Sequence, residues 1–548
     1  MTAEHARQAE QTDQDQYDVV VVGGGAAGLS GALALARARR SVLVVDSGQP
    51  RNAPAGHVHN FLAREGTSPE ELLAAGRAEV AGYGGRVTDG RVVRAERDGD
   101  GFRLTLAADG AGPASDASRE VRARRLLVTT GLVDELPEVP GLAARWGRDV
   151  LHCPYCHGWE VRDRRIGLLA TGPLAWHQAE MWRQWSPEVV VLLHGTERPA
   201  PEQAERLAAR GIPVVTGPVA ELETADDALT GVRLASGERV ALDALVVTAR
   251  VTARAELLES LELAPEPVEF GGLVVGSQIA ADPVGATAAP GVWVAGNVAD
   301  VQAQVVTAAA AGLKAGAAIN ADLIAEDTRA AVAEHRVRVG AMFEQEAWEE
   351  RYRSRPVLWS GRPNPQLVVE ADSLKPGRAL EVGAGEGADA LWLAERGWRV
   401  DAVDISATAL ERAAAHAVGR PGAESVTWVR ADLREEPPTE GGYDLVTAQY
   451  MHLPGAARTE LYARLADAVA PGGTLLLVGH DPSDLRVATR SALMPDALFT
   501  GGELASALDP DRWQVAAAET RTREVVDGDG NSVLVRDAVL VALRREDA

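Results

Sequence analysis

The chain contains two cysteines in 548 residues, Cys153 and Cys156, and only two positions separate them. Two thiols at this spacing can close a small disulfide ring, and a Cys-X-X-Cys setting commonly lowers the pKa of one thiol. The pair therefore favours redox chemistry. Two alternatives stay open: a zinc site, which needs about four ligands and would have to use His152 or His157, and two buried thiols without a chemical role. We expect no metal, because the chain has no second cysteine pair.

A nucleotide-binding pattern precedes the cysteine pair. Residues 17–22 predict a buried strand, residues 29–37 a helix, and residues 41–45 a second strand that ends at an acid. In this arrangement the glycines permit a tight turn, the helix N-terminus faces a pyrophosphate, and the acid accepts ribose hydroxyls. The alternative is a glycine-rich turn that binds nothing. The residues expected to bind a dinucleotide are Gly23, Gly25, Ala26, Ala27, Gly28 and Asp46.

Two later segments resemble the flavin-contacting parts of the low-molecular-weight thioredoxin reductase family. Each is a predicted strand that ends in small or polar residues, at 126–131 and at 291–297, and a helix over 305–320 follows the second. The resemblance covers about residues 17–325. It implies bound FAD, and the further residues that it places at the flavin are Thr130, Gly131, Gly296, Asn297 and Gln304.

Asn297 departs from that family, which usually carries an aspartate here whose carboxylate contacts the ribityl chain. An asparagine keeps one acceptor and loses the charge. We therefore expect the flavin to be tuned differently in this chain.

The cysteine pair enters a second strand–turn–helix pattern, which in the reductase family belongs to an inserted domain that binds NADPH. Here the glycine pattern is broken, because only Gly172 lies at the phosphate turn. At the end of the next strand, Glu197 and Arg198 stand where a 2′-phosphate would need clustered arginines. The sequence leaves NADPH binding open.

The cysteine motif also departs from the reductases, which place an acid after the second cysteine, where this chain has His157. Residues 151–160 resemble instead the flavin-dependent dithiol oxidases that close disulfides in gliotoxin- and holomycin-type metabolites. Arg51 and Asn52 fit that branch, so Asn52 is a further expected cofactor contact. The resemblance implies that electrons pass from a substrate dithiol through the cysteine pair and FAD to oxygen, without NADPH.

The same resemblance implies roles at the catalytic pair. Cys153 would exchange with the substrate sulfur, and Cys156 would lie nearest the flavin. His157 could take the thiol proton, because its unperturbed pKa suits neutral pH. The alternative for His157 is a residue at a helix start that bonds to the backbone.

A different glycine motif lies in the C-terminal part. A predicted strand ends in glycines at every second position, a helix follows over 388–395, and a strand over 399–403 ends at an acid. The pattern resembles class I S-adenosylmethionine-dependent methyltransferases over about residues 345–548, and a third dinucleotide domain is the alternative. The resemblance implies that the glycines make room for the methionine part, while the acids hold the ribose and contact the adenine. The implied residues are Glu381, Gly383, Gly385, Gly387, Asp404 and Asp432.

The methyl acceptor is less defined. The segment resembles methyltransferases of the thiopurine and tellurite-resistance type, which implies a small molecule or a chalcogen as the acceptor. A thiolate needs little help from a base, so catalysis could depend mostly on positioning. Tyr352 and Trp359 precede the first strand, where the fold often places its substrate cover, and His452 is a weak candidate for a base.

Composition limits the partners. A net charge of -24 argues against nucleic acid, and the chain has neither a secretory signal nor an apolar run of membrane-spanning length. A cytoplasmic protein is therefore expected, with small-molecule partners. The family resemblance leaves a homodimer open. The predicted segments are a disordered tail at 1–16, a discontinuous FAD domain at 17–147 and 248–325, an inserted NAD(P)-type domain at 148–247, a helical connector at 326–350, and a methyltransferase domain at 351–548.

The fold class that follows is α/β: a two-domain FAD/NAD(P)-type dinucleotide-binding fold, then a methyltransferase domain with a Rossmann-like fold. The expected function is bifunctional, with a FAD-dependent dithiol/disulfide oxidoreductase joined to a methyltransferase that acts on a thiol or another small molecule. Two alternatives remain. The first is an NADPH-dependent disulfide reductase joined to a methyltransferase, and the second is a redox and S-adenosylmethionine sensor whose methyltransferase half is inactive.

Overall fold

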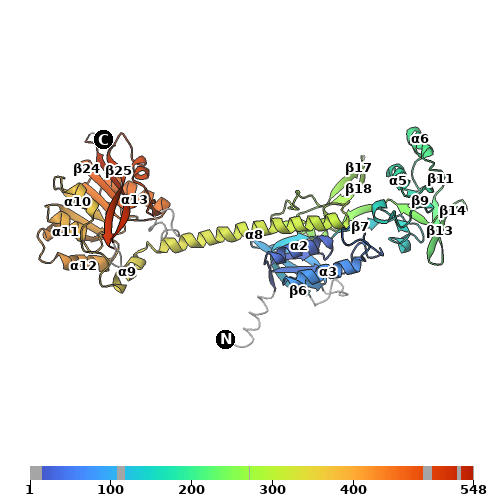
Figure 1. Ribbon diagram of the computed structural model, residues 1–548, viewed down its shortest axis with the longest axis horizontal. Coiled ribbons are helices and arrows are strands. Elements are labelled where there is room, and N and C mark those ends of the chain that lie inside the picture. Colours follow the sequence, from blue (N-terminus) through green and yellow to red (C-terminus); the bar gives the residue numbers. More distant parts are fainter. Residues whose placement is uncertain (1–14, 108–117, 271, 485–496, 527–531, 547–548) are drawn as a thin grey trace, which may run out of the picture. The chain divides into compact units, whose positions relative to one another are not determined.

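The computed structural model describes residues 15–107, 118–270, 272–484, 497–526 and 532–546 (Figure 1). The chain divides into two compact units, of which the first ends at Asp327 and the second begins at Thr328. The tail predicted for residues 1–16 lies, up to residue 14, outside the described part, and Gln16 already begins a strand. Among the described residues, no helix is both long and apolar enough to span a lipid bilayer.

The first unit is built on a sheet with the strand order β3-β2-β1-β6-β5-β4, in which β19 pairs with β6. The central strand β1 (Gln16–Val22) lies between β2 (Val42–Asp46) and β6 (Ser118–Val128), and both neighbours run parallel to it. These strands form because their apolar runs are buried on both faces. The other elements of this layer are α2 (Ala26–Arg37), α3 (Pro69–Gly82), β3 (Arg86–Asp89), β4 (Arg91–Asp98), β5 (Gly101–Ala107) and β19 (Val292–Val294).

The inserted domain has a parallel sheet of its own, with the order β11-β10-β9-β15-β8. The short helix α4 (Pro154–His157), which carries the second cysteine, follows the edge strand β8 (Val150–Leu151). The inserted domain also contains a small antiparallel sheet with the order β12-β13-β14. The remaining elements are β9 (Ile166–Ala170), α5 (Leu174–Trp182), β10 (Val189–Leu193), α6 (Pro201–Ala209), β11 (Val214–Thr216), β12 (Val219–Ala225), β13 (Ala228–Leu234), β14 (Arg239–Ala241) and β15 (Ala244–Val247).

Two strands carry the chain into and out of the inserted domain. They are β7 (Leu132–Glu135) and β16 (Arg250–Ala253), which pair antiparallel to each other. They belong to a sheet with the order β17-β18-β16-β7. Further elements of this region are η1 (Ala143–Arg145), α7 (Glu256–Glu259), β17 (Glu266–Phe270), β18 (Leu273–Gln278) and η2 (Gly296–Val298).

Helix α8 (Val305–Ala341) is longer than the predicted helix over 305–320, and it includes part of the predicted connector at 326–350. The sequence from 321 to 339 contains no glycine or proline that would end it. Helix α9 (Gln345–Ser354) crosses the predicted boundary at residue 351. Its Glu349 accepts hydrogen bonds from the hydroxyls of Ser406 (2.7 Å) and Thr408 (2.5 Å), so α9 packs with the second unit.

The second unit contains a seven-stranded sheet with the order β22-β21-β20-β23-β24-β26-β25. Strands β20 to β24 are parallel, and β26 is antiparallel to β24. The strands are β20 (Arg378–Val382), β21 (Arg399–Asp404), β22 (Val426–Arg430), β23 (Tyr443–Gln449), β24 (Val469–His480), β25 (Trp513–Val526) and β26 (Ser532–Arg544). The helices are α10 (Pro365–Ala371), α11 (Ala388–Ala394), α12 (Ala407–Ala417), η3 (Ala423–Ser425), α13 (Gly455–Ala468) and α15 (Gly501–Ser506).

Candidate functional site

A cavity of about 1560 Å³ in the first unit contains most of the residues that the sequence singled out there. It begins at the glycine turn after β1, passes the ends of β6 and β19, and reaches the cysteine helix α4. Only Gly28 of the predicted set does not line it. The predicted residues that line it are Gly23, Gly25, Ala26, Ala27, Asp46, Asn52, Thr130, Gly131, Cys153, Cys156, His157, Gly296, Asn297 and Gln304.

The glycine turn leaves room for a ligand at Gly25. Gly23 has a φ of +107°, and a Cβ there would lie 2.5 Å from the carbonyl oxygen of Thr129, so the protein itself requires a glycine. Gly25 has an ordinary φ of -76°, and a Cβ there would meet no atom within 4 Å. It caps the N-terminus of α2, where backbone N–H groups attract anions. The free space at Gly25 therefore fits a pyrophosphate group.

Asp46 ends β2 at this turn, and its carboxylate already has partners. It accepts a hydrogen bond from the backbone N–H of Gly48 (3.2 Å) and forms an ion pair with Arg77 of α3. Arg77 also pairs with Asp89 (3.0 Å). Sequence patterns do not indicate Arg77 as a partner of Asp46, because its approach depends on how α3 packs beside β2.

Asn297 has a task that a carboxylate could not perform. Its side-chain amide donates hydrogen bonds to the carbonyl oxygens of Asp300 and Ala303, both at 3.0 Å, and so fixes the turn before α8. The amide oxygen remains as an acceptor beside the cavity. The residue that replaces the family's usual aspartate thus holds the backbone that leads to Gln304.

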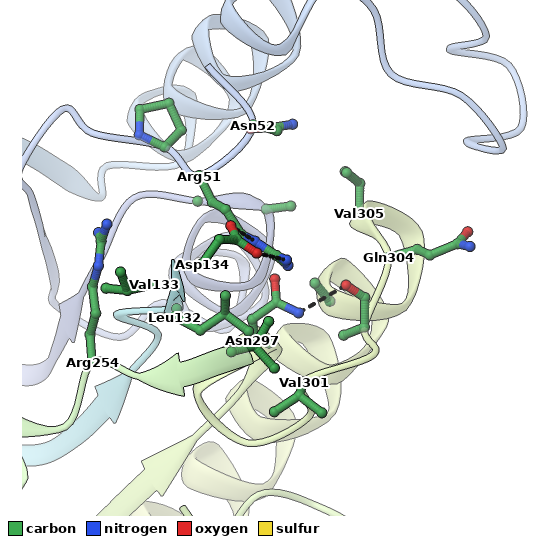
Figure 2. A pocket seen from close by; sticks show the side chains of 18 of the residues that line it. Arg51, Asn52, Leu132, Val133, Asp134, Arg254, Asn297, Val301, Gln304 and Val305 are labelled. Atoms are coloured by element: carbon green, nitrogen blue, oxygen red, sulfur yellow. Dashed lines mark hydrogen bonds and ion pairs between the residues drawn. The ribbon is translucent and has the colours of Figure 1, made fainter. Parts of the chain in front are cut away.

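An ion pair lies in the same cavity, between Arg51 and Asp134 (Figure 2). The guanidinium donates two hydrogen bonds to the carboxylate, at 2.8 Å and 2.6 Å. The positive charge of Arg51 also acts on the thiols, where it helps to lower the pKa of Cys153. Arg51 thus joins the loop after β2 to strand β7.

The two thiols share their protons unequally. Cys153 is the N-cap of α4, and its pKa falls from 9.0 to about 7, chiefly because the thiol of Cys156 hydrogen-bonds to it, with the backbone N–H groups of Cys156 and Tyr155 also contributing. The same interaction, together with burial, raises the pKa of Cys156. Both thiols are free and half-buried. Cys153 is therefore the thiol of the reduced pair that ionises more readily near neutral pH, and it is the stronger nucleophile.

His157 directly follows Cys156 and is suited to accept a proton. Neither of its buried ring nitrogens has a hydrogen-bond partner within the described part of the chain, so the alternative of a side chain bonded to the backbone does not apply. Burial lowers the pKa of His157, which keeps the imidazole neutral at pH 7. His152, by contrast, makes a 3.2 Å hydrogen bond to the carbonyl oxygen of Val247.

The sequence reading missed the loop between β2 and α3, which brings two histidines to the cavity. His57 and His59 both line it. His59 bonds to Glu65 at 2.6 Å, and its other ring nitrogen lies 3.4 Å from Glu160, just after α4. A His-X-His pattern soon after the ribose-binding acid was the available signal.

The second nucleotide motif offers little for a phosphate. Gly172 follows β9 as expected and, like Gly25, leaves open space, but the N-cap of α5 is Pro173, whose nitrogen carries no hydrogen to donate. His194 at the end of β10 accepts a hydrogen bond from the backbone N–H of Val219 (3.0 Å). Leu174 and Gln178 of α5 line the same cavity as the cysteines. This part of the inserted domain thus borders the cavity that contains the thiols.

In the second unit, the glycine turn after β20 surrounds a buried acidic site. Gly383, Gly385 and Gly387 all have positive φ values, of 75°, 54° and 84°. The carboxylate of Asp404 accepts hydrogen bonds from the backbone N–H groups of Gly385 (2.8 Å) and Ser406 (2.9 Å), and burial raises its pKa. Asp404 therefore lies against the glycine turn, where the resemblance places the ribose.

Two buried acceptor atoms at the ends of neighbouring strands lack partners. They are Oε2 of Glu381 on β20 and Oε1 of Gln449 on β23, and neither has a hydrogen-bond partner in the described part of the chain. The ammonium group of S-adenosylmethionine supplies donors of this kind. The sequence indicated Glu381 but not Gln449, whose orientation only the sheet reveals.

The carboxylate of Asp432 forms an ion pair with the guanidinium of Arg434. Both of its carboxylate oxygens bond to Arg434, which also pairs with Glu344 before α9. These interactions lower the pKa of Asp432. It remains at the end of β22, beside the position where the resemblance places the adenine.

His452 is a poor base. Its Nε2 accepts a hydrogen bond from the backbone N–H of His480 (2.9 Å), and burial together with His480 lowers its pKa to about 3. The rings of His452 and His480 stack at 5.0 Å. The weak expectation of a base at His452 is therefore not supported by its surroundings.

Trp359 and Tyr352 lie over the glycine turn of the second unit. The indole nitrogen of Trp359 donates to the hydroxyl of Tyr352 (2.8 Å). A Cβ at Gly385 would come within 3.0 Å of that hydroxyl. These two side chains cover the glycine turn, and their role as a substrate cover stays a prediction.

Comparison with known proteins agrees with this geometry. The pyridine nucleotide-disulphide oxidoreductase family matches residues 17–312, which is more than half of the chain. The chain belongs to this family. A methyltransferase domain family matches residues 379–473. The predicted α/β fold class and both resemblances are confirmed, and the chain joins a thioredoxin reductase-like oxidoreductase to a methyltransferase domain. These families imply FAD, a nicotinamide nucleotide and S-adenosylmethionine as cofactors.

Several relatives span the first part of the chain. The thioredoxin reductase tcpT of Claviceps purpurea (strain 20.1) is 32% identical over 327 residues, covering 56% of this chain and 95% of that protein. The thioredoxin reductase sirT of Leptosphaeria maculans is 30% identical over 332 residues, covering 57% and 96%. The crystal structure of HlmI is 44% identical with a TM-score of 0.53, covering 59% of this chain and 97% of that one.

Proposed function

We propose that the first unit oxidises a small-molecule dithiol and transfers the electrons through its cysteine pair and FAD to oxygen. The observation that carries the proposal is that Cys153, Cys156 and the neutral, unpartnered His157 line the same cavity as the dinucleotide-binding glycine turn. No domain movement is needed to bring the thiols to this cavity. When bound, FAD would take two electrons from the cysteine pair and return them to oxygen.

The residues of the chain can perform the thiol exchange themselves. With the pair oxidised, a substrate sulfur attacks Cys153, the Cys153–Cys156 bond breaks, and its electron pair goes to Cys156. His157 takes the proton that the attacking thiol loses. The second substrate sulfur then displaces Cys153, so the substrate leaves as a disulfide and the pair is reduced. The low pKa of Cys153 makes it a good leaving group in this second step.

We further propose that the second unit binds S-adenosylmethionine and methylates a sulfur. Asp404 would hold the ribose hydroxyls, while Glu381 and Gln449 would accept from the ammonium group. A thiol acceptor needs little base assistance, which agrees with the occupied nitrogen of His452. Both units would then act on one kind of small sulfur compound, closing it as a disulfide or capping it with methyl groups.

One observation favours a second candidate, an NADPH-dependent disulfide reductase: the curated relatives carry the name thioredoxin reductase. The weak phosphate turn at Gly172 and Pro173 opposes it. Oxygen uptake separates the two. We expect the purified protein to consume oxygen and release hydrogen peroxide with dithiothreitol alone. Activity that requires NADPH and a disulfide would contradict the proposal and support the reductase.

We also propose a location and an oligomeric state for the protein. A cytoplasmic location agrees with free thiols at a redox site. We propose a homodimer with small-molecule partners, which light scattering of the purified protein would test.

A further inference from the structure

The loop between β2 and α3 is attached to the cysteine helix. The side-chain amide of Asn60 donates a 2.6 Å hydrogen bond to the carbonyl oxygen of Tyr155, which lies between the two cysteines. The backbone of Val58 and Thr67 closes the base of this loop (2.8 Å). The loop is therefore in a fixed position relative to the thiols.

Within this loop, His59 is held at both ring nitrogens by carboxylates. Nδ1 lies 2.6 Å from Glu65, on the loop itself, and Nε2 lies 3.4 Å from Glu160, just after α4. The backbone N–H of Asn60 also donates to Glu65 (2.9 Å), which fixes the carboxylate. An imidazole between two carboxylates can accept a proton at one nitrogen and release one from the other.

Exposure increases along this row of side chains. The ring nitrogens of His157 are buried, the side chain of His59 is 17% exposed, and that of Glu65 is 65% exposed. His157 and His59 line the same cavity, and Glu160, which contacts His59, follows His157 by three positions in the chain. Since the described residues give its ring no hydrogen-bond partner, a proton taken up by His157 needs a neighbouring group to receive it.

We propose that His59, held between Glu65 and Glu160, receives the substrate-derived proton from His157 and releases it to solvent through Glu65. The inference rests on the proposed dithiol oxidation. In the step concerned, the substrate S–H bond breaks, its sulfur bonds to Cys153, the electron pair of the Cys153–Cys156 bond goes to Cys156, and the proton leaves through His157 and His59. Without this exit, His157 would stay protonated and could not serve the second thiol.

The titratable groups that face His59 come from its own loop and from the segment that carries the cysteines. They are Glu65 and Glu160 on either side of the ring, His157 toward the thiols, and His57, whose ring centroid lies 6.1 Å away.

The test is anaerobic stopped-flow bleaching of the flavin by dithiothreitol, measured on the full-length protein between about pH 5.5 and 8.5. We expect His59→Gln to slow bleaching roughly tenfold at pH 7, less than the 10²-fold or more that loss of a direct acid–base group costs. Added imidazole should restore the rate in proportion to its concentration, because a free base can remove the proton in place of His59.

Two further variants separate proton transfer from folding and loop position. His335→Gln alters a histidine of α8 that bonds to Arg338, and it should keep the wild-type rate. Asn60→Ala cuts the bond to Tyr155 without touching a histidine, so any loss there should not respond to imidazole. An unchanged rate in His59→Gln, or a loss that imidazole does not restore, would overturn the role of His59. If dithiothreitol fails to bleach even the wild type, the proposed dithiol oxidation fails first.

Discussion

The Cys156→Ala substitution tests how the cysteine pair distributes its protons. In the wild type the Cys156 thiol is the largest cause that lowers the pKa of Cys153, from 9.0 to about 7. Removing the thiol removes that hydrogen bond, while burial, which raises the pKa of Cys153, stays. The pKa of Cys153 should therefore return toward 9.

The size of the effect follows from the thiolate fraction. At pH 7 a thiol with a pKa of about 7 is roughly 50% thiolate, whereas one with a pKa near 9 is about 1% thiolate. The thiolate of the thiol with the higher pKa is intrinsically more nucleophilic, by about eightfold for a difference of two pKa units. The net result is that Cys153 in Cys156→Ala should react about sixfold more slowly at pH 7.

The assay is alkylation of the reduced protein by iodoacetamide between about pH 5.5 and 9.5, with the modified peptide measured by mass spectrometry. Wild-type Cys153 should give a midpoint near pH 7, and the variant a midpoint well above it. Cys153→Ser serves as the control. The Cys153 thiol, the largest cause that raises the pKa of Cys156, is gone in this variant, but burial still raises that pKa, so Cys156 should react slowly at pH 7. A midpoint near 7 in both wild type and Cys156→Ala would refute the assignment of the low pKa to the Cys156 thiol.

Three other substitutions test the glycine turn after β1, the turn before α8 and the packing of α9. Gly25→Ala should fold normally, since a Cβ there meets no protein atom. It should lose FAD, which flavin absorbance after gel filtration would show, and a full flavin content would contradict a pyrophosphate site at Gly25. Asn297→Asp removes both bonds to the turn before α8 and should lower the free energy of unfolding by about 1–3 kcal/mol in denaturant titrations; an equally stable variant would show that the bonds do not matter. The pKa of Glu349 falls from 4.5 to about 2 because Ser406 and Thr408 bond to it against the effect of burial. The stability that the ionised Glu349 carboxylate contributes should be complete above about pH 4.5 and lost as the pH falls toward 2. Glu349→Gln should therefore unfold more easily than the wild type at pH 7 but match it near pH 2. A stability difference that does not change with pH would contradict this.

Much of the fold could be predicted from local sequence, because each nucleotide motif combines a buried strand, a glycine turn and a helix within about 30 residues. The same locality placed the cysteine pair and the acids that end strands, such as Asp46 and Asp404. Helix length was harder to predict. Nothing in the sequence after residue 320 distinguishes a connector from the continuation of α8, since the same helix-forming residues serve both.

The side chains that could not be predicted act across elements far apart in the chain. His59 meets Glu160 over about a hundred positions, and Arg77 reaches Asp46 because α3 packs beside β2. Gln449 faces its site only because β23 lies next to β20. Residue type and spacing do not indicate such contacts, because the contacts arise only from tertiary packing.

Anaerobic titration of the purified flavoprotein decides whether electrons pass from a small dithiol through Cys153 to the flavin. We expect one equivalent of a small dithiol to bleach the flavin and oxygen to restore the yellow colour. NADPH alone should leave the spectrum unchanged, and Cys153→Ser should abolish bleaching by the dithiol. Bleaching by NADPH with no response to dithiols, or dithiol bleaching that persists in Cys153→Ser, would contradict it.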